Sequence, residues 1–174
     1  MSRRRSTILG ALAALATLAS CGYHLVGRAS NIPADVKKVH LRTFENTTQR
    51  VGVEQILTRA VADELVTRQR FEIVSDPAQA DAELAGTVLG FSLVPVTFDA
   101  DGRASEYEIV ITAKILFHRL TPETVLWSND RYQFRDSYPV ESSSAGFVDR
   151  ETATIEQAAK KFAETVVTDL LEGF

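Results

Sequence analysis

The only cysteine of the chain lies where a lipid can be attached. Cys21 follows the small residues of Leu18-Ala19-Ser20, and this arrangement is a lipobox, in which cleavage leaves the thiol on the first mature residue. Such a thiol accepts diacylglycerol through a thioether and the new amino group accepts an acyl chain, each buried methylene contributing about 0.8 kcal/mol to membrane binding. A lone cysteine also has no partner for an internal disulfide. The sequence therefore predicts a covalent lipid on Cys21 and no other cofactor.

Residues 1–20 have the composition of a secretory signal peptide. Three arginines at positions 3–5 precede an apolar run from Ile8 to Leu18, and a basic start before a short apolar run is typical of such peptides. As a helix this run spans roughly 16 Å against a hydrocarbon core of about 30 Å, so it is too short for a permanent membrane span. The alternative is an ordinary signal peptide followed by a chance cysteine, which would leave Cys21 unmodified.

The residue after the anchor and the charge of the mature chain indicate where the protein works. Gly22 follows Cys21, and lipoproteins of this kind are sent to the outer membrane unless an aspartate at that position retains them. Removal of residues 1–20 takes away three of the 19 basic residues and none of the 23 acidic ones, which leaves 16 against 23 and a net charge of −7. This balance argues against nucleic-acid binding through a general phosphate attraction. We expect a lipid-anchored domain at the outer membrane that faces the periplasm.

No group of residues has the spacing of an enzyme's active site. His24, His40 and His118 are far apart in the sequence and match no metal-ligand pattern. No glycine-rich loop follows a strand and opens a helix, so a phosphate-binding cradle is not indicated. A two-carboxylate hydrolase would use acidic pairs, but solvated hairpin charges explain those present, which are Asp99 with Asp101 and Glu106 with Glu108. We expect no enzymatic activity, no metal site, and no cleft where carboxylates or histidines converge.

Hydrophobic periodicity divides the mature chain into a short tether and one folded domain. Residues 21–35 have few periodic apolar positions and are predicted to be the tether, whereas residues 36–174 suit a single domain with one core. Apolar residues at steps of three and four predict helices over residues 53–69 and from about 149 to 173, and alternating ones predict strands. The predicted strands cover residues 38–44, 71–74, 82–97, 105–118 and 125–135.

These elements follow the order β-α-β-β-β-β-α, which predicts an α+β fold. The two early strands are expected to lie parallel across a right-handed crossover, and the later strands to form an antiparallel meander. Both helices would then cover one face of a mixed four- to five-stranded sheet, giving a two-layer sandwich with a long central β-hairpin. Along residues 105–118 one side of the strand is apolar, and the other, with Glu108, Thr112 and Lys114, is mixed.

The central hairpin is predicted to be longer than the helices that cover it. Residues 105–118 span roughly 46 Å as a strand, whereas the helix over residues 53–69 covers about 25 Å. Roughly 20 Å of hairpin should therefore overhang the helices, with its tip at residues 98–103. We interpret this tip as a contact surface. The alternatives are a mobile decoration, or a strand that bends at Gly90, at Pro95 or at a β-bulge and wraps back over the core.

The order of these features resembles the LPS-assembly lipoprotein family LptE over nearly the whole mature length. The likeness rests on several stretches in a shared order and spacing, which are Cys21-Gly22-Tyr23-His24-Leu25, then Pro33 followed by Val39-His40-Leu41-Arg42-Thr43-Phe44-Glu45-Asn46, then Gly102-Arg103-Ala104-Ser105-Glu106-Tyr107-Glu108, and finally Leu126-Trp127 with the closing helix. The resemblance implies a non-enzymatic partner of an LptD-type outer-membrane β-barrel. Such a protein sits inside the barrel lumen, helps to assemble the barrel and assists lipopolysaccharide delivery to the cell surface.

The resemblance also implies that basic residues near the hairpin tip contact lipopolysaccharide phosphates. Arg103 is the only cation at the tip, and an arginine can bind phosphate through two hydrogen bonds. A second basic position before the last helix is met only approximately, by Arg150. The preceding Asp99-Ala100-Asp101 departs from the family pattern, because its carboxylates would repel phosphate. Arg103 and Arg150 are therefore the predicted lipopolysaccharide contacts, and a solvated surface arginine is the alternative at Arg103.

A periplasmic scaffold or interaction lipoprotein of another envelope or secretion machine is the alternative function. Domains of β-α-β-β-β-α order also occur in such lipoproteins, which likewise carry an anchor and no active site. The sequence leaves both functions open. The proteins that are recovered together with the chain would distinguish them.

Overall fold

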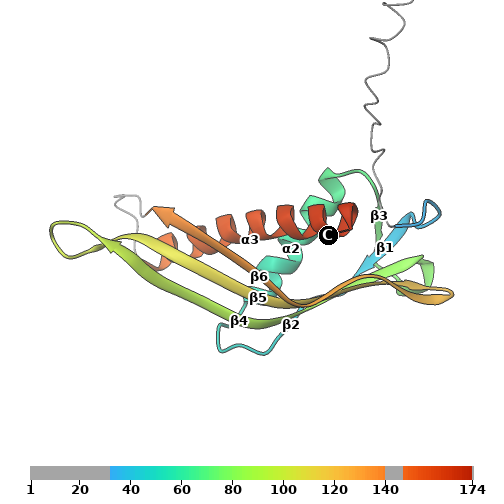
Figure 1. The fold of residues 1–174 in the computed structure, drawn as a ribbon, viewed down its shortest axis with the longest axis horizontal. Coiled ribbons are helices and arrows are strands. Elements are labelled where there is room, and N and C mark those ends of the chain that lie inside the picture. The colour runs from blue at the N-terminus through green and yellow to red at the C-terminus, as the bar shows by residue number, and fades with distance from the viewer. Residues whose placement is uncertain (1–31, 140–146, 174) are drawn as a thin grey trace, which may run out of the picture.

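The computed structural model describes residues 32–139 and 147–173, and over residues 147–151 it describes the backbone alone. In chain order the elements are β1 (Lys38–Leu41), β2 (Glu45–Asn46), α2 (Val53–Thr67), β3 (Glu72–Val74), the 3-10 turn η1 (Pro77–Gln79), β4 (Ala82–Phe98), β5 (Ala104–Leu120), β6 (Glu123–Pro139) and α3 (Phe147–Glu172). Figure 1 shows three long strands, β4, β5 and β6, with α3 lying along them. The predicted signal peptide and Cys21 lie outside the described residues.

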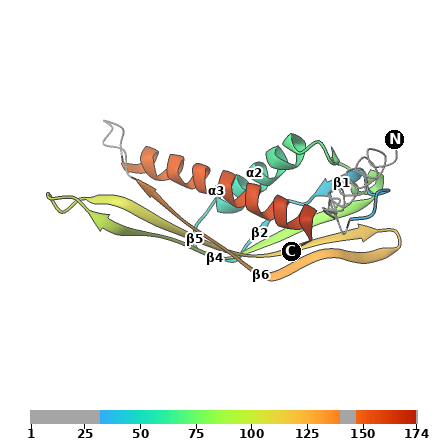
Figure 2. The ribbon, with the colours of Figure 1, turned by 45° about the horizontal axis from the view of Figure 1, so that its top comes forward.

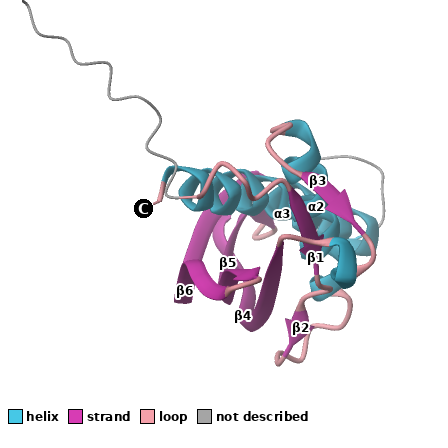
Figure 3. Ribbon diagram, turned by 90° about the vertical axis from the view of Figure 1, so that its right-hand side faces the viewer, coloured by secondary structure: helices cyan, strands magenta, loops and turns pink. Residues whose placement is uncertain are grey.

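The strands form one mixed sheet under two helices. Its order is β3-β1-β4-β5-β6, and β2 also pairs with β4. β1 runs parallel to β3 and to β4, whereas β4, β5 and β6 form an antiparallel meander. Both helices lie on the same face of the sheet (Figure 2), and Figure 3 shows the helical layer and the strands in a view along the long axis. The predicted two-layer α+β sandwich and the order of its elements are confirmed.

The sheet has six strands instead of the predicted four or five because the first predicted strand is interrupted. The strand expected over residues 38–44 ends at Leu41, and β2 then resumes pairing with β4. Between the two, the buried Phe44 ring lies directly on Gly86, where a Cβ atom would come within 2.6 Å of ring carbons. The Phe44 N–H donates to Thr58 Oγ1 of α2 at 2.9 Å. Phe44 therefore turns out of the strand to fill the space above a glycine and to contact the helical layer.

The core lies between the helices and the inward side of β5. The inward residues of β5 are fully or almost fully buried, as the alternation predicted, and they are Ile109, Ile111, Ala113, Ile115 and Phe117. Both helices bury one stripe, made by Val53, Leu57, Val61 and Leu65 of α2 and by Ile155, Ala158, Ala159, Phe162, Ala163, Val166, Val167 and Leu170 of α3. In the described part of the chain, neither helix combines the length and apolar character needed to cross a bilayer.

Aromatic and polar contacts fasten α3 to β6. The Phe162 ring meets the edges of Tyr132 and Phe134 at centroid distances of 5.9 and 6.0 Å. The Tyr132 hydroxyl donates to Asp169 Oδ2 at 2.8 Å. Burial, together with this acceptor, raises the pKa of Tyr132 to about 12, so the hydroxyl keeps its proton and its hydrogen bond at physiological pH. The last helix is thus held to the edge strand by both apolar and directional contacts.

The β4–β5 hairpin reaches past the helical layer. The two strands have 17 residues each and α3 has 26, which correspond to about 56 Å of strand and about 39 Å of helix. In Figures 1 and 2 the hairpin tip lies beyond the first turn of α3. Register shifts between Val88 and Gly90 and after Pro95 mark β-bulges, which bend the strands. They do not fold the hairpin back over the core, so the predicted overhang is present.

The carboxylate of Asp81 ties the start of β1 to the start of β4. Asp81 Oδ2 accepts hydrogen bonds from the Lys38 N–H at 2.8 Å and the Lys37 N–H at 2.9 Å. These two bonds hold the pKa of Asp81 below its usual value, and the bond from Lys38 has the larger effect. Because the folded pKa is lowered, this carboxylate contributes stability that is present above the unfolded pKa of about 3.9. That contribution is lost as the pH falls through the folded pKa.

Substitution of Gly86 tests the contact with Phe44. Gly86→Ala should lower the free energy of unfolding by about 1–3 kcal/mol, because the new methyl group overlaps a buried ring that has little room to move. Gly90→Ala is the matched control on the same strand, since a Cβ there meets Thr112 at an ordinary 3.5 Å. Urea denaturation measures both. Equal stability of the two variants would contradict the close contact between Phe44 and Gly86.

Substitution of Asp81 tests the hydrogen bonds that connect the start of β1 to the start of β4. Asp81→Asn should lower the free energy of unfolding at pH 7 by roughly 1 kcal/mol, because two charge-assisted hydrogen bonds become neutral at a partly exposed site. The difference from the unsubstituted chain should narrow below about pH 4, where the carboxyl begins to be protonated in the unfolded chain. Urea midpoints between pH 7 and pH 2.5 measure this. A difference that stays constant with pH would rule out the carboxylate as its cause.

Candidate functional site

The outward face of β4, β5 and β6 is the sheet surface that the helices leave uncovered. Side chains of β5 alternate across the sheet, and since the inward set is buried, the other set faces outward. The outward set mixes charged, polar and apolar residues, as predicted from the sequence, and consists of Glu106, Glu108, Val110, Thr112, Lys114, Leu116 and His118. Such a face can form hydrogen bonds and apolar contacts with a partner over its whole length.

Four charged side chains of this outward face are paired across neighbouring strands. The Arg135 guanidinium donates to both carboxylate oxygens of Glu108, at 3.1 and 3.2 Å. Lys114 Nζ lies 2.9 Å from Asp130 Oδ1. Exposed pairs of this kind contribute at most about 1 kcal/mol each. The pairing therefore neutralises these four side chains, and it costs little to rearrange when a partner binds.

The hairpin tip is a three-residue loop, residues 100–102, closed by Asp99 and Arg103. Asp99 Oδ1 accepts hydrogen bonds from the backbone N–H groups of Asp101 at 2.9 Å and Arg103 at 2.8 Å. Gly102 has φ of +75° and donates its N–H to the Asp99 carbonyl at 3.0 Å. A turn followed by a left-handed glycine is the usual geometry of a three-residue hairpin loop. The Asp101-Gly102 sequence thus predicted the hairpin, and the Asp99 side chain stabilises the loop through two hydrogen bonds to its backbone.

Arg103 lies at the tip as predicted, but a carboxylate accompanies it. Its Nη1 is 3.5 Å from Asp101 Oδ2, and both side chains are more than 70% exposed. The guanidinium is therefore accessible to a ligand, in a local field that Asp99 and Asp101 make negative. Arg150 belongs to the first turn of α3, and its side chain, like the whole of Cys21, lies outside the described residues. Lipopolysaccharide contact by Arg103 and Arg150 and lipid attachment at Cys21 stay predictions.

Strand order brings two histidines into one row that the sequence did not predict. His40 of β1 and His118 of β5 are both paired with Glu83 of β4, which lies between them. Glu83 is also 3.6 Å from the guanidinium of Arg42, and His40 Nδ1 lies 3.2 Å from the Val74 carbonyl, to which it can donate. In the described ranges no three such side chains are placed to hold a metal ion. Only knowledge of the β1–β4–β5 order reveals this row.

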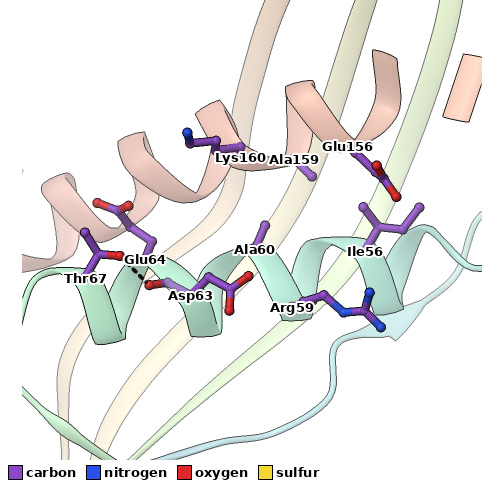
Figure 4. A pocket seen from close by; sticks show the side chains of 9 residues that line it. All are labelled: Ile56, Arg59, Ala60, Asp63, Glu64, Thr67, Glu156, Ala159 and Lys160. Carbon is purple, nitrogen blue, oxygen red and sulfur yellow. Dashed lines mark hydrogen bonds between the residues drawn. The ribbon is translucent and has the colours of Figure 1, made fainter. Parts of the chain in front are cut away.

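An open groove of about 380 Å³ runs between α2 and α3 on the side away from the sheet. Figure 4 shows its lining, which consists of Ile56, Arg59, Ala60, Asp63, Glu64 and Thr67 from α2 and Glu156, Ala159 and Lys160 from α3. Three carboxylates border it, although no such gathering was expected. Glu64 is engaged by Arg68 at 2.6 Å, and the lining holds no histidine and no thiol. The Thr67 hydroxyl donates to the Asp63 carbonyl at 2.8 Å. The groove therefore offers surface charges of both signs, without a histidine or a thiol.

Comparison with known proteins supports a lipopolysaccharide-related family. A family model described as LptE, lipopolysaccharide-assembly, matches residues 36–170. No curated protein sequence matches the chain.

Several solved structures share the fold at low sequence identity. A candidate lipoprotein from Caulobacter crescentus CB15 is similar with a TM-score of 0.50 and 18% identity, over 74% of this chain and 88% of that one. Protein XCC0632 from Xanthomonas campestris gives 0.52 and 17%, over 81% and 88%. The hypothetical protein CT253 from Chlamydia trachomatis gives 0.53 and 8%, over 80% and 99%. At these identities the likeness shows the fold alone.

A double-mutant cycle tests whether the ion pairs of the outward face are structural. Glu108→Ala, Arg135→Ala and the double variant should give a coupling free energy of at most about 1 kcal/mol, because both side chains contact solvent. Urea denaturation of the four chains measures this coupling. A value above about 2 kcal/mol would mean that the pair holds the hairpin together, and the face would then not be free to rearrange on binding.

Proposed function

This chain belongs to the LptE lipopolysaccharide-assembly family, and we propose that it is an outer-membrane lipoprotein that plugs and helps to assemble an LptD-type β-barrel. In this role it assists lipopolysaccharide delivery to the cell surface. The family is non-enzymatic, and no cofactor is expected for it. The observation that carries the proposal is the family match over residues 36–170, on a fold that leaves one face of three 17-residue strands uncovered.

The outward sheet face suits the lumen of a barrel. Side chains that line such a lumen are polar, and they alternate with lipid-facing ones along each strand. A plug in that lumen has to replace water around these polar groups with its own hydrogen-bonding groups. The paired charges of Glu108 with Arg135 and of Lys114 with Asp130 can exchange partners at low cost, because they are exposed. The intervening apolar residues would add close packing without unsatisfied polar atoms.

The end of the sheet at which the described chain begins supports this placement. Ala82 pairs with Val39 of β1 and with Arg119 of β5, so the first described residues and the start of β4 share one end of the sheet. The hairpin tip is at the other end (Figure 1). The segment from Cys21 to the first described residue can span at most about 40 Å. A lipid on Cys21 would therefore keep the near end close to the membrane while the hairpin extends along the barrel axis.

Arg103 and Arg150 are the cations that we propose for lipopolysaccharide phosphates. The Arg103 side chain is exposed at the end of an overhanging hairpin, where it can reach a ligand without disturbing the core. A phosphate there would have to displace Asp101 from the guanidinium. Direct lipopolysaccharide binding is consequently expected to be weak at this tip, and the contribution of the protein to transport would come mainly through the barrel.

Depletion of the protein tests the proposed function. Surface lipopolysaccharide and the amount of mature barrel should both fall several-fold on depletion, because the barrel would lose its plug. Complementation with the unsubstituted chain should restore both, whereas Cys21→Ser should not incorporate labelled palmitate and should restore less. If depletion changes neither quantity, and if the lipoprotein is recovered only with inner-membrane or peptidoglycan proteins, the scaffold function in another envelope or secretion machine is correct instead.

A further inference from the structure

The distal half of β4 has a free edge. On one side β4 pairs with β1 at residues 82–84 and with β2 at residues 87 and 88. Past Val88 no described strand pairs with that side, while β5 accompanies the other side to the tip. Residues 89–98 therefore present roughly 33 Å of unpaired strand. Edges of this length normally invite pairing with another chain unless charges, prolines or bulges protect them.

Exposed apolar side chains gather on this free half of β4. In the described part of the chain, large hydrophobic residues that are exposed include four from this segment, with exposed fractions between 43% and 58%, namely Leu89, Val94, Val96 and Phe98. The opposite edge of the sheet, β6, has one such residue, Val125 near its start, and otherwise carries exposed charged residues, among them Asp130, Arg131 and Arg135. Charge protects the β6 edge, whereas the β4 edge keeps an apolar row along its unpaired backbone.

The surroundings of this apolar row are acidic. Residues 94–108 contain four acidic residues and one basic residue, a net charge of −3, and these are Asp99, Asp101, Glu106 and Glu108 against Arg103. Asp101 is accompanied by Arg103 and Glu108 by Arg135, whereas Asp99 and Glu106 have no ion-pair partner among the described residues. This field would weaken the contact of a lipid phosphate with Arg103 and would repel the same hairpin of a second copy. It would attract a cationic partner.

We infer that the β4 edge, residues 89–98, binds an extended polypeptide segment that carries lysine or arginine beside apolar residues, added to the sheet as a further strand. Backbone hydrogen bonds would supply the register, and contacts with the apolar row would supply the affinity. The basic side chains of the segment would face Asp99 and Glu106. The identity of the partner, the barrel protein, rests on the proposed function. The chemical character of the bound segment does not depend on that function.

Pro95 limits how the added strand can pair. A proline has no N–H to donate, and within sheets it is confined to edges and bulges. A segment added here would make continuous hydrogen bonds along residues 90–94, past the register shift at Leu89. Beyond Pro95 it would lie against Val96 and Phe98 through side chains alone. The same proline, together with the bulge that follows it, disfavours unselective pairing of this edge with any strand.

Paired substitutions at Val96 test the inference on the purified full-length lipoprotein in a nonionic detergent. The probes are two fluorescent octapeptides, one alternating lysine with valine and one alternating glutamate with valine. The unsubstituted chain should bind the lysine peptide at least about fivefold more tightly than the glutamate peptide. Val96→Lys should weaken binding of the lysine peptide about fivefold, and Val96→Glu should weaken it less than about twofold, because one rim charge contributes about 1 kcal/mol.

Gln133→Lys and Gln133→Glu on the β6 edge are the matched controls, and both should leave the affinity unchanged. Circular dichroism confirms the fold of every variant, and Val96 is suited to this test because it lies outside the core. Equal affinity of the two peptides, equal effects of the two Val96 variants, or no binding of the lysine peptide would overturn the inference. If Val96→Glu weakens lipopolysaccharide binding and Val96→Lys does not, the edge contacts an anionic lipid instead. If both variants abolish self-association, the edge binds a second copy of the chain instead.

Recovery of the barrel separates this inference from the proposed function. If the chain binds the lysine peptide as expected but recovers no barrel, strand addition holds and the barrel partner is excluded. If all Val96 variants recover as much barrel as the unsubstituted chain, the proposed function holds and the β4 edge is not part of its interface. Loss of barrel with Val96→Lys but not with Val96→Glu supports both.

Discussion

Burial of the inward row of β5 beneath the two helices is the interaction on which the rest of this structure depends. The side chains from Ile109 to Phe117 occupy alternate positions and are almost completely removed from water. A strand shifted by one residue would place Glu108, Thr112 and Lys114 in that core instead, so the register between β4, β5 and β6 is strongly specified. Because that register is fixed, the composition of the outward face and the reach of the hairpin are fixed with it.

Local periodicity was sufficient to predict the elements that contribute most to this core. α2, α3 and β5 were predicted within a few residues because each carries a long apolar stripe with a clear period. The interruption between β1 and β2 was not predicted, because it depends on Phe44 packing against a glycine 42 positions away in sequence. β6 is longer at both ends than predicted, since the added residues are mostly polar and gain their strand conformation by pairing with β5.

The candidate site, too, was predictable from local sequence patterns only in part. Its outward polar face follows from the alternation along β5, and the place of Arg103 follows from the turn signal beside it. The partners of these residues depend on register: Arg135 reaches Glu108 from a different strand, and His40 joins His118 only because β4 lies between β1 and β5. The free edge of β4 is a property of topology as well, since no local pattern reveals where a neighbouring strand ends.

Small residues between α2 and α3 limit the width of the helical layer. Ala60 of α2 and Ala159 of α3 line the groove between the helices, and Ala159 is fully buried. Methyl side chains at a helix contact allow the axes to approach toward the short end of the usual 8–10 Å range. Larger residues there would widen the helical layer and leave the core itself no better filled. If the protein enters a β-barrel as proposed, a slender cross-section would matter for that entry, and steric clearance would constrain these alanines in addition to packing.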